Sequence, residues 1–255
     1  MKTINILCAT ACITSMVISN TLFAGGPDRL YLGVGAGFEN NIYQTIDDEV
    51  DPLPLINAQK GGFYWEGTDI GYRVYENRNI EIGPVYSLFE GYGFDQEDLG
   101  KGKGYDGLET RDSGQSYGLF IGFEFEPFSL GIKPMKHSEA GSSLEISIEH
   151  EYRKNDWLIM SSLFVEHLDK DYTDHYFGVS QAEVSNPLNT QITNTYKADS
   201  ANNIGLEFGV FYQISDKWLL SGRLEYVSLD KAITDSPLVE DDYAYSFSTG
   251  ISYRF

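Results

Sequence analysis

The chain has 255 residues, of which 42% are hydrophobic, and its 18 basic and 38 acidic residues give a formal net charge of −20. A surface this acidic repels nucleic-acid phosphates, so we expect no nucleic-acid partner. The mean hydropathy of −0.28 argues against a helical membrane protein. It does not argue against a transmembrane β-barrel, because half of each barrel strand faces water or the lumen.

Residues 1–24 have the order of a secretory signal peptide. Lys2 is followed by an apolar run and by the small residue Ala24, which predicts cleavage after Ala24, or alternatively after Gly25. The run is rich in Thr, Ser and Asn, which disfavours a transmembrane helix. Cleavage after Ala24 would remove Lys2 and leave 25–255 as one barrel domain with a net charge of −21. It would also remove Cys8 and Cys12, the only two cysteines of the sequence.

Strand-like alternation begins soon after this segment. Apolar residues at even positions from Leu30 to Phe38 alternate mainly with small ones, which predicts a first strand. Residues 39–66 are long and polar, and they contain two closely spaced prolines, which are poor strand interior. We therefore predict a loop over 39–66. The following strands are predicted over 70–74, 80–88, 117–125, 128–133, 144–152, 157–165, 204–214, 218–226 and 243–255.

The connections between these strands mostly alternate between short and long. Outer-membrane barrels have short periplasmic turns, longer external loops and both termini inside. We therefore predict an all-β fold, an antiparallel transmembrane β-barrel of about ten strands with periplasmic termini. Twelve strands are the alternative, if 63–65 and 176–179 are strands, but that arrangement places the long 92–114 connection on the periplasmic side. The five predicted external loops carry −15 of the net charge of −21.

The last thirteen residues, YAYSFSTGISYRF, have an aromatic and apolar face at odd positions and a small polar face at even ones. A soluble β-sandwich could also bury such a strand. The chain ends on Phe255, however, and a terminal aromatic strand resembles the signal that the barrel assembly machinery of bacteria recognises. We therefore predict that Tyr253 and Phe255 form an assembly signal.

Seven charged residues are predicted to face the lumen, because a charge facing lipid costs several kcal/mol. They could line a pore or a binding site, or they could simply pair with one another in a solvated lumen. These candidates are Arg73, Glu124, Glu145, Glu149, Glu207, Arg223 and Glu225.

Apolar islands interrupt the acidic external loops. In water they would expose apolar surface, at about 25 cal/mol per Å² relative to burial. We predict that they fold into the barrel mouth and narrow it, although strand extensions above the membrane are an alternative. The residues concerned are Pro52, Leu53, Pro54, Leu55, Phe63, Tyr64, Trp65, Tyr176 and Phe177.

No catalytic or metal-binding pattern stands out. The four histidines, at positions 137, 150, 167 and 175, have no metal-ligand spacing. His175 follows Asp174, but such neighbours are too common to indicate catalysis. Nucleophile-elbow, P-loop and dinucleotide motifs are missing from the sequence. We expect a protein that is not an enzyme and that needs no cofactor.

Several further motifs follow one another along the chain, at residues 51–59, 61–63, 176–180, 212–218, 235–239 and 253–255. In this order they resemble the MltA-interacting protein (MipA/OmpV) family, although Lys60 departs from the apolar or aromatic residue more usual at its position. The resemblance implies an outer-membrane protein, described in some members as a scaffold joining a lytic transglycosylase to a murein synthase, and in others as porin-like or adhesive.

Together these observations predict a protein of the bacterial outer membrane, in contact with its lipid and lipopolysaccharide. A scaffold linked to murein synthesis and envelope maintenance is the first interpretation of its function. A small cation-preferring channel is the second, because Gly-rich inner faces leave lumen space and acidic residues favour cations. An adhesin is a further alternative.

Overall fold

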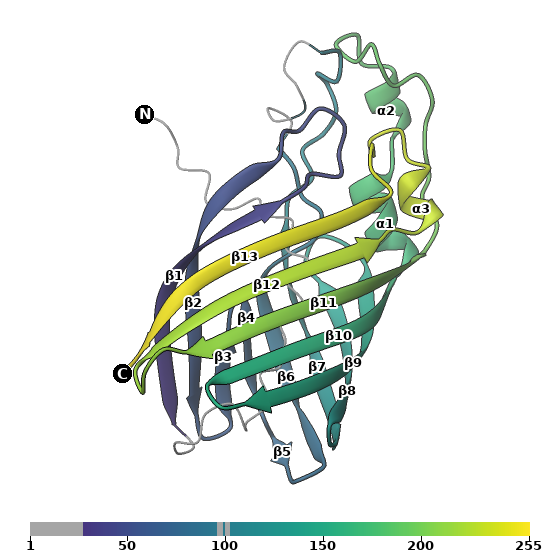
Figure 1. The fold of residues 1–255 in the computed structure, drawn as a ribbon. Coiled ribbons are helices and arrows are strands. Elements are labelled where there is room, and N and C mark those ends of the chain that lie inside the picture. Colours follow the sequence, from purple (N-terminus) through teal and green to yellow (C-terminus); the bar gives the residue numbers. More distant parts are fainter. Residues whose placement is uncertain (1–27, 96–98, 100–102) are drawn as a thin grey trace.

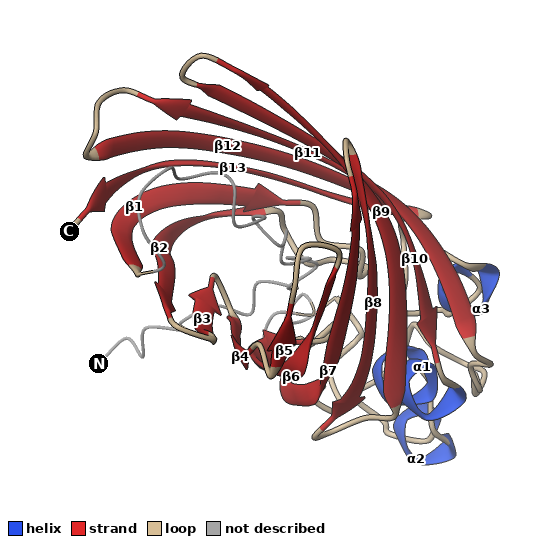
Figure 2. Cartoon of the chain, turned by 90° about the horizontal axis from the view of Figure 1, so that it is seen from below, coloured by secondary structure: helices blue, strands red, loops and turns tan. Residues whose placement is uncertain are grey.

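The computed structural model describes residues 28–95, 99 and 103–255. One antiparallel sheet closes into a barrel through the β1–β13 and β4–β6 pairings, as Figures 1 and 2 show. The two-residue strand β5 only extends β4 along β6, so the ring has twelve strand positions. The strands are β1 (Arg29–Glu39), β2 (Glu49–Lys60), β3 (Phe63–Glu66), β4 (Asp69–Tyr72), β5 (Tyr75–Glu76), β6 (Ile80–Glu90), β7 (Gly114–Phe125), β8 (Phe128–His137), β9 (Ser142–Lys154), β10 (Trp157–Leu168), β11 (Ala201–Gln213), β12 (Trp218–Ser228) and β13 (Tyr243–Arg254).

The barrel has twelve strands, which is the stated alternative to the preferred count of about ten. Both additional strands, β2 and β3, lie inside the segment 39–66 that the sequence assigned to a loop. The alternative of twelve strands named 63–65, which does lie in β3, and 176–179, where Tyr176 and Phe177 instead end a helix. Because both extra strands precede residue 70, the connection 91–113 stays at the external end.

The outer face of the barrel wall is apolar, whereas the inner face carries charged side chains together with small apolar clusters such as Val85, Phe120 and Met135. Outward side chains of β11 are 45–56% exposed at Ile204, Leu206 and Phe208, whereas the inward Glu207 between them is 3% exposed. Aromatic residues ring the end with short turns: Trp157 packs on Tyr212 with ring centroids 4.5 Å apart. This is the pattern of a wall solvated by lipid, with an interfacial aromatic girdle.

The long connections contain three helices, α1 (Lys170–Phe177), α2 (Gln181–Val184) and α3 (Lys231–Thr234). Helix α1 starts where the Asp169 carboxylate accepts a hydrogen bond from the Tyr172 amide at 2.9 Å. Its buried face is formed by Tyr172, Thr173, Tyr176 and Phe177, at the spacing expected for one side of a helix. In the described part of the chain, none of the helices has the length and apolar character needed to cross a membrane.

Candidate functional site

The inner face of the barrel carries carboxylates and serines in register across neighbouring strands. They form a row across the strands: Ser129 lies opposite Glu124 and Glu149 in the strand register, and Ser162 lies opposite Glu149 and Glu207. Glu225 continues it opposite Glu207. Such rows follow the hydrogen-bonding direction of the sheet, so a tilted barrel carries them obliquely around the lumen.

Four buried ion pairs cross the lumen or line it. Arg73 and Arg223 bind Glu81 and Glu207, each at 2.8 Å. Two further pairs join residues that the sequence interpretation did not single out, Arg29 with Glu66 at 3.3 Å and Lys133 with Asp69 at 2.7 Å. Glu66 was missed because 39–66 was assigned to a loop, and Asp69 because the next strand was predicted to start one residue later, at 70. Strand alternation alone places Glu81 and Lys133 inside.

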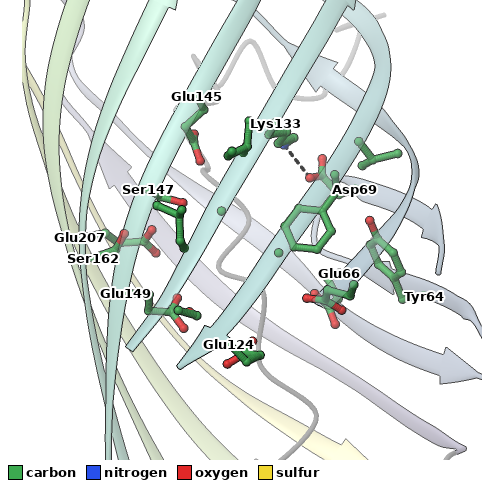
Figure 3. Close-up of a pocket in the computed structure, with 18 residues that line it drawn as sticks. Tyr64, Glu66, Asp69, Glu124, Lys133, Glu145, Ser147, Glu149, Ser162 and Glu207 are labelled. Atoms are coloured by element: carbon green, nitrogen blue, oxygen red, sulfur yellow. Dashed lines mark hydrogen bonds and ion pairs between the residues drawn. The ribbon is translucent and has the colours of Figure 1, made fainter. Parts of the chain in front are cut away.

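A cavity lies among these groups (Figure 3). Its lining includes Glu124, Glu145 and Glu149, which point into it from β7 and β9. Within the described residues, none of these three carboxylates has a cationic partner within 4.0 Å. The other predicted lumen charges Arg73, Glu207 and Arg223 each belong to an ion pair. The lumen therefore combines paired charges with three uncompensated carboxylates. Glu225 does not line the cavity, but it is buried and lies in the same row.

The predicted in-folded residues divide into three groups. Tyr176 and Phe177 are 0% exposed in the external loops, and Tyr64 is buried on the inner wall. Leu53 and Leu55 lie inside the wall, where they cover Gly37 and Gly250.

The prediction is wrong for the other four, which belong to the wall and face outward. A strand sends alternate side chains to opposite faces, so the neighbours of inward Leu53, Leu55 and Tyr64 cannot enter the mouth. These outward residues are Pro52, Pro54, Phe63 and Trp65.

The predicted assembly signal lies at the periplasmic end of the lipid-facing surface. Phe255 is 73% exposed, and its ring lies 5.1 Å from that of Tyr253. Tyr253 in turn contacts Trp218 on the neighbouring strand, with centroids 5.0 Å apart.

The long connections at the external mouth pack together, and we call them the cap. The cap consists of the described connections 40–48, 91–113, 138–141, 169–200 and 229–242. Buried residues from all five pack together with the inward-facing tops of β10 to β13. At its centre the Tyr43 ring lies 4.6 Å from Phe94 and 5.9 Å from Phe177. Because the five connections follow β1, β6, β8, β10 and β12, this cluster lies across the mouth from every part of the ring except the β3–β4 hairpin.

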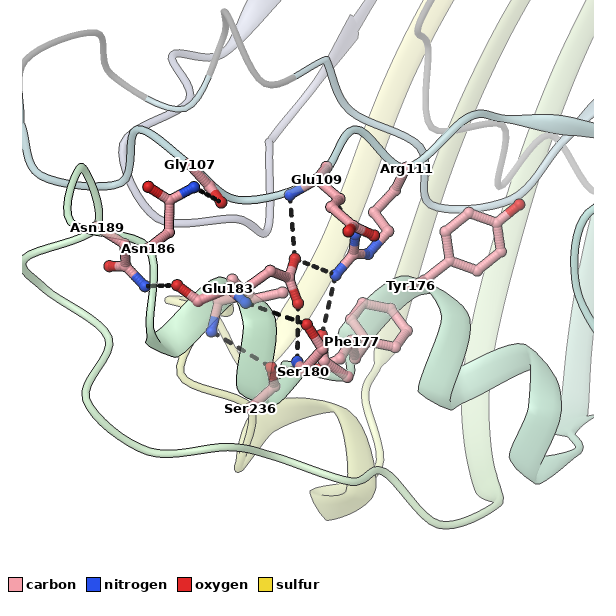
Figure 4. A network of polar contacts seen from close by, with 12 residues as sticks. Gly107, Glu109, Arg111, Tyr176, Phe177, Ser180, Glu183, Asn186, Asn189 and Ser236 are labelled. Carbon is pink, nitrogen blue, oxygen red and sulfur yellow. Dashed lines mark hydrogen bonds and ion pairs between the residues drawn. The ribbon is translucent and has the colours of Figure 1, made fainter.

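A buried polar network ties the cap loops together (Figure 4). Arg111 donates to Glu183 at 2.7 Å and to the Gly178 carbonyl at 3.2 Å. Glu183 also accepts from the amides of Glu109 at 3.0 Å and Ser180 at 2.7 Å. A third loop joins through Ser236, whose hydroxyl donates to the Phe177 carbonyl at 2.6 Å.

Burial alone raises the pKa of Glu183, but the Ser180 and Glu109 amides and the Arg111 guanidinium outweigh it and lower the pKa below 4.5. Glu183 is therefore ionised at neutral pH and accepts from its three donors, the Arg111 guanidinium and the Glu109 and Ser180 amides. Within the described residues, no group of three or more His, Asp or Glu side chains is placed to hold a metal ion.

Comparison with known proteins gives consistent results along the chain. The family profile described as "MltA-interacting protein MipA" matches residues 32–255. The "MltA-interacting protein" of Escherichia coli K12 is 22% identical over 243 residues, which are 94% of this chain and 96% of that protein. The "24 kDa outer membrane protein" of Pasteurella multocida is 25% identical over 255 residues, 96% of each chain. Among solved structures, the NanC porin covers 87% of this chain and 98% of its own at 9% identity, with a TM-score of 0.47.

Proposed function

Because the chain belongs to the MltA-interacting protein (MipA) family of outer-membrane β-barrels, we propose that it is an interaction protein and not an enzyme. In this proposal it binds a lytic transglycosylase and a murein synthase in the periplasm, and it thereby links murein synthesis to the outer membrane. The name of the family suggests the lytic transglycosylase as a partner, and the family resemblance suggests the murein synthase.

The observation that favours an interaction role over transport is the cap. Its apolar cluster joins the five long external connections, so a solute would have to displace packed aromatic side chains to enter from outside. Among the described residues, the periplasmic end has only short turns, so a partner there contacts a narrow rim. That rim combines exposed aromatic rings, such as Trp157 and Trp218, with exposed Lys154 and Lys217.

Binding of the refolded chain to a purified lytic transglycosylase tests this proposal. Reversing two periplasmic charges, Lys154→Glu with Lys217→Glu, should change the affinity by about tenfold, because rim charges steer and stabilise docking. The matched control reverses two exposed external lysines, Lys170→Glu with Lys231→Glu, and should leave the affinity unchanged. No binding by the wild-type chain contradicts the proposal.

A cation-preferring channel is the second candidate function. The three uncompensated carboxylates of the lumen cavity, Glu124, Glu145 and Glu149, favour it, because carboxylate rings select cations. This candidate requires the cap to open. A steady cation current through the wild-type barrel, lost in Glu145→Gln with Glu149→Gln, would establish it in place of the interaction role.

A further inference from the structure

One section of the barrel wall is far shorter than the rest. Strands β3 and β4 have four residues each, against 10 to 13 in the other wall strands. At about 3.3 Å per residue, this hairpin is roughly 13 Å tall, whereas the neighbouring strands reach roughly 35–40 Å. The hairpin turns at Gly67, whose amide donates to the Ile56 carbonyl at 3.0 Å, part of the way along β2.

Beyond Ile56, β2 has a strand partner only on the β1 side in the described structure. The Ile56 carbonyl points toward the hairpin, and backbone groups of a strand alternate in direction. Pro52 and Pro54 therefore turn their backbone to the same open edge, where they supply no N–H donor. An edge without donors cannot extend its pairing with the hairpin, which keeps this join short.

The join on the other side is interrupted. β4 pairs with β6 from Asp69 to Gly71, and the ladder resumes at Tyr75 and Glu76 of β5. Below this point the Ile82 carbonyl accepts from Val74 at 2.9 Å, so Pro84, two residues further on, also turns its backbone toward the hairpin and again lacks a donor. Proline thus removes ladder hydrogen bonds on both sides of the same hairpin.

Side chains from inside the lumen hold the hairpin instead. The Asp69 carboxylate accepts from Lys133 of β8 at 2.7 Å and from Ser87 of β6 at 2.6 Å. Glu66 binds Arg29 of β1 at 3.3 Å. Lys133 lies two strands beyond β6, so its ion pair connects the hairpin to a fully paired part of the wall.

The hairpin also forms one side of the lumen cavity, through Tyr64, Glu66 and Asp69 (Figure 3). We propose that the β3–β4 hairpin is a movable section of the wall that opens this cavity sideways to the membrane, with the Lys133–Asp69 ion pair as its latch. Segments with few ladder hydrogen bonds open at lower free energy than the core of a fold. With the mouth closed by the cap, this side opening is a separate route into the lumen, and it does not depend on the periplasmic partner.

Hydrogen exchange of the full barrel in lipid nanodiscs tests the movement. Amides of 63–72 should exchange at least about tenfold faster than those of 157–168, because their ladders are short. Lys133→Met should accelerate 63–72 by a further factor of about ten or more, since it leaves Asp69 buried without its cation. The control, Arg153→Met, removes the Arg153–Glu151 pair within β9 and should leave 63–72 unchanged. Equal exchange of both segments, or equal acceleration of both by Lys133→Met, overturns the proposal.

The sideways direction needs its own test. A cysteine replacing Val85, which lines the cavity, should react with a bilayer-restricted pyrene maleimide, and about tenfold faster when Lys133→Met is added. Joining Ile70 to Tyr86, which are opposite each other in the β4–β6 pairing, by a crosslink should abolish this reaction. If Lys133→Met fails to assemble, Asp69→Asn serves as the milder latch variant. An unreactive cysteine in both latch variants overturns the proposal.

Discussion

The barrel wall and the cap place apolar residues in opposite ways. On the wall Phe208 is 45% exposed while Glu207 beside it is buried. In the cap Phe177 is 0% exposed, and the exposed ion pair of Lys170 with Asp199 lies on its surface. The same chain thus builds an inside-out structure where lipid is the solvent and an ordinary apolar core where water is. The surrounding solvent, and not the residue type, decides where an aromatic ring stabilises this protein.

Removal of a ring should show this difference most strongly. Phe177→Ala deletes a fully buried side chain and should destabilise the cap by about 3–5 kcal/mol. The matched change on the wall, Phe208→Ala, removes contacts largely with lipid and should cost clearly less. Urea unfolding monitored by cap proteolysis and by barrel heat-modifiability separates the two effects. Equal losses would contradict the contrast between wall and cap.

The buried Arg111–Glu183 pair should make the cap sensitive to acid. Arg111→Met leaves a buried carboxylate unpaired and should cost about 3–5 kcal/mol. The folded pKa of Glu183 is lowered, so its stabilising contribution is complete above the unfolded pKa and is lost as pH falls below 4.5 toward the folded pKa. Limited proteolysis of the cap between pH 7 and pH 3 should show this loss. Glu183→Gln should flatten the profile, and an unchanged profile would show that another group controls it.

A charge on the lipid face should affect the wall and spare the cap. Leu206 is 56% exposed on the outer surface, and Leu206→Arg should destabilise the barrel by about 2–4 kcal/mol if it lies near the bilayer midplane. The control Ser162→Arg places the same charge on the inner face among carboxylates. Folding into liposomes at graded urea concentrations measures both, and a larger cost for Ser162→Arg would reverse the assigned facing.

The smallest effect is expected on the cap surface. Lys170 and Asp199 are 3.1 Å apart but are 49% and 84% exposed, so Asp199→Asn should change cap stability by less than about 1 kcal/mol. The proteolysis assay used for Arg111→Met provides a direct comparison. A loss as large as that of Arg111→Met would mean that burial does not distinguish these two ion pairs.

Alternation in the sequence was sufficient to locate the regular part of the wall. It placed β7 to β13 and their facing, because a period of two is imposed wherever one side meets lipid. It failed at β2, where Pro52 and Pro54 argue against a strand. Those prolines are tolerated because their backbone faces an edge without a neighbour, and that edge depends on the length of a hairpin that local sequence does not reveal.

The cap was only partly predictable. The apolar island at Tyr176 and Phe177 indicated burial. The helix that contains these residues, which starts after Asp169 and ends before Gly178, was not predicted. Arg111 and Glu183 had no signal in the sequence, since they lie 72 positions apart and meet only when two loops pack together. Alternation located lumen charges on the strands that were recognised. It missed Glu66, whose strand was not predicted, and Asp69, which lies one residue before the predicted start of its strand.

The central claim is that the cap closes the lumen to the outside. Single-channel recording of the full refolded chain in a planar bilayer tests it most directly. The wild-type barrel should show no steady conductance, whereas Phe177→Ala combined with Arg111→Met, which loosens the cap while leaving the wall intact, should produce frequent openings that prefer cations. A stable open current through the wild-type protein, unaffected by these two substitutions, would contradict the account.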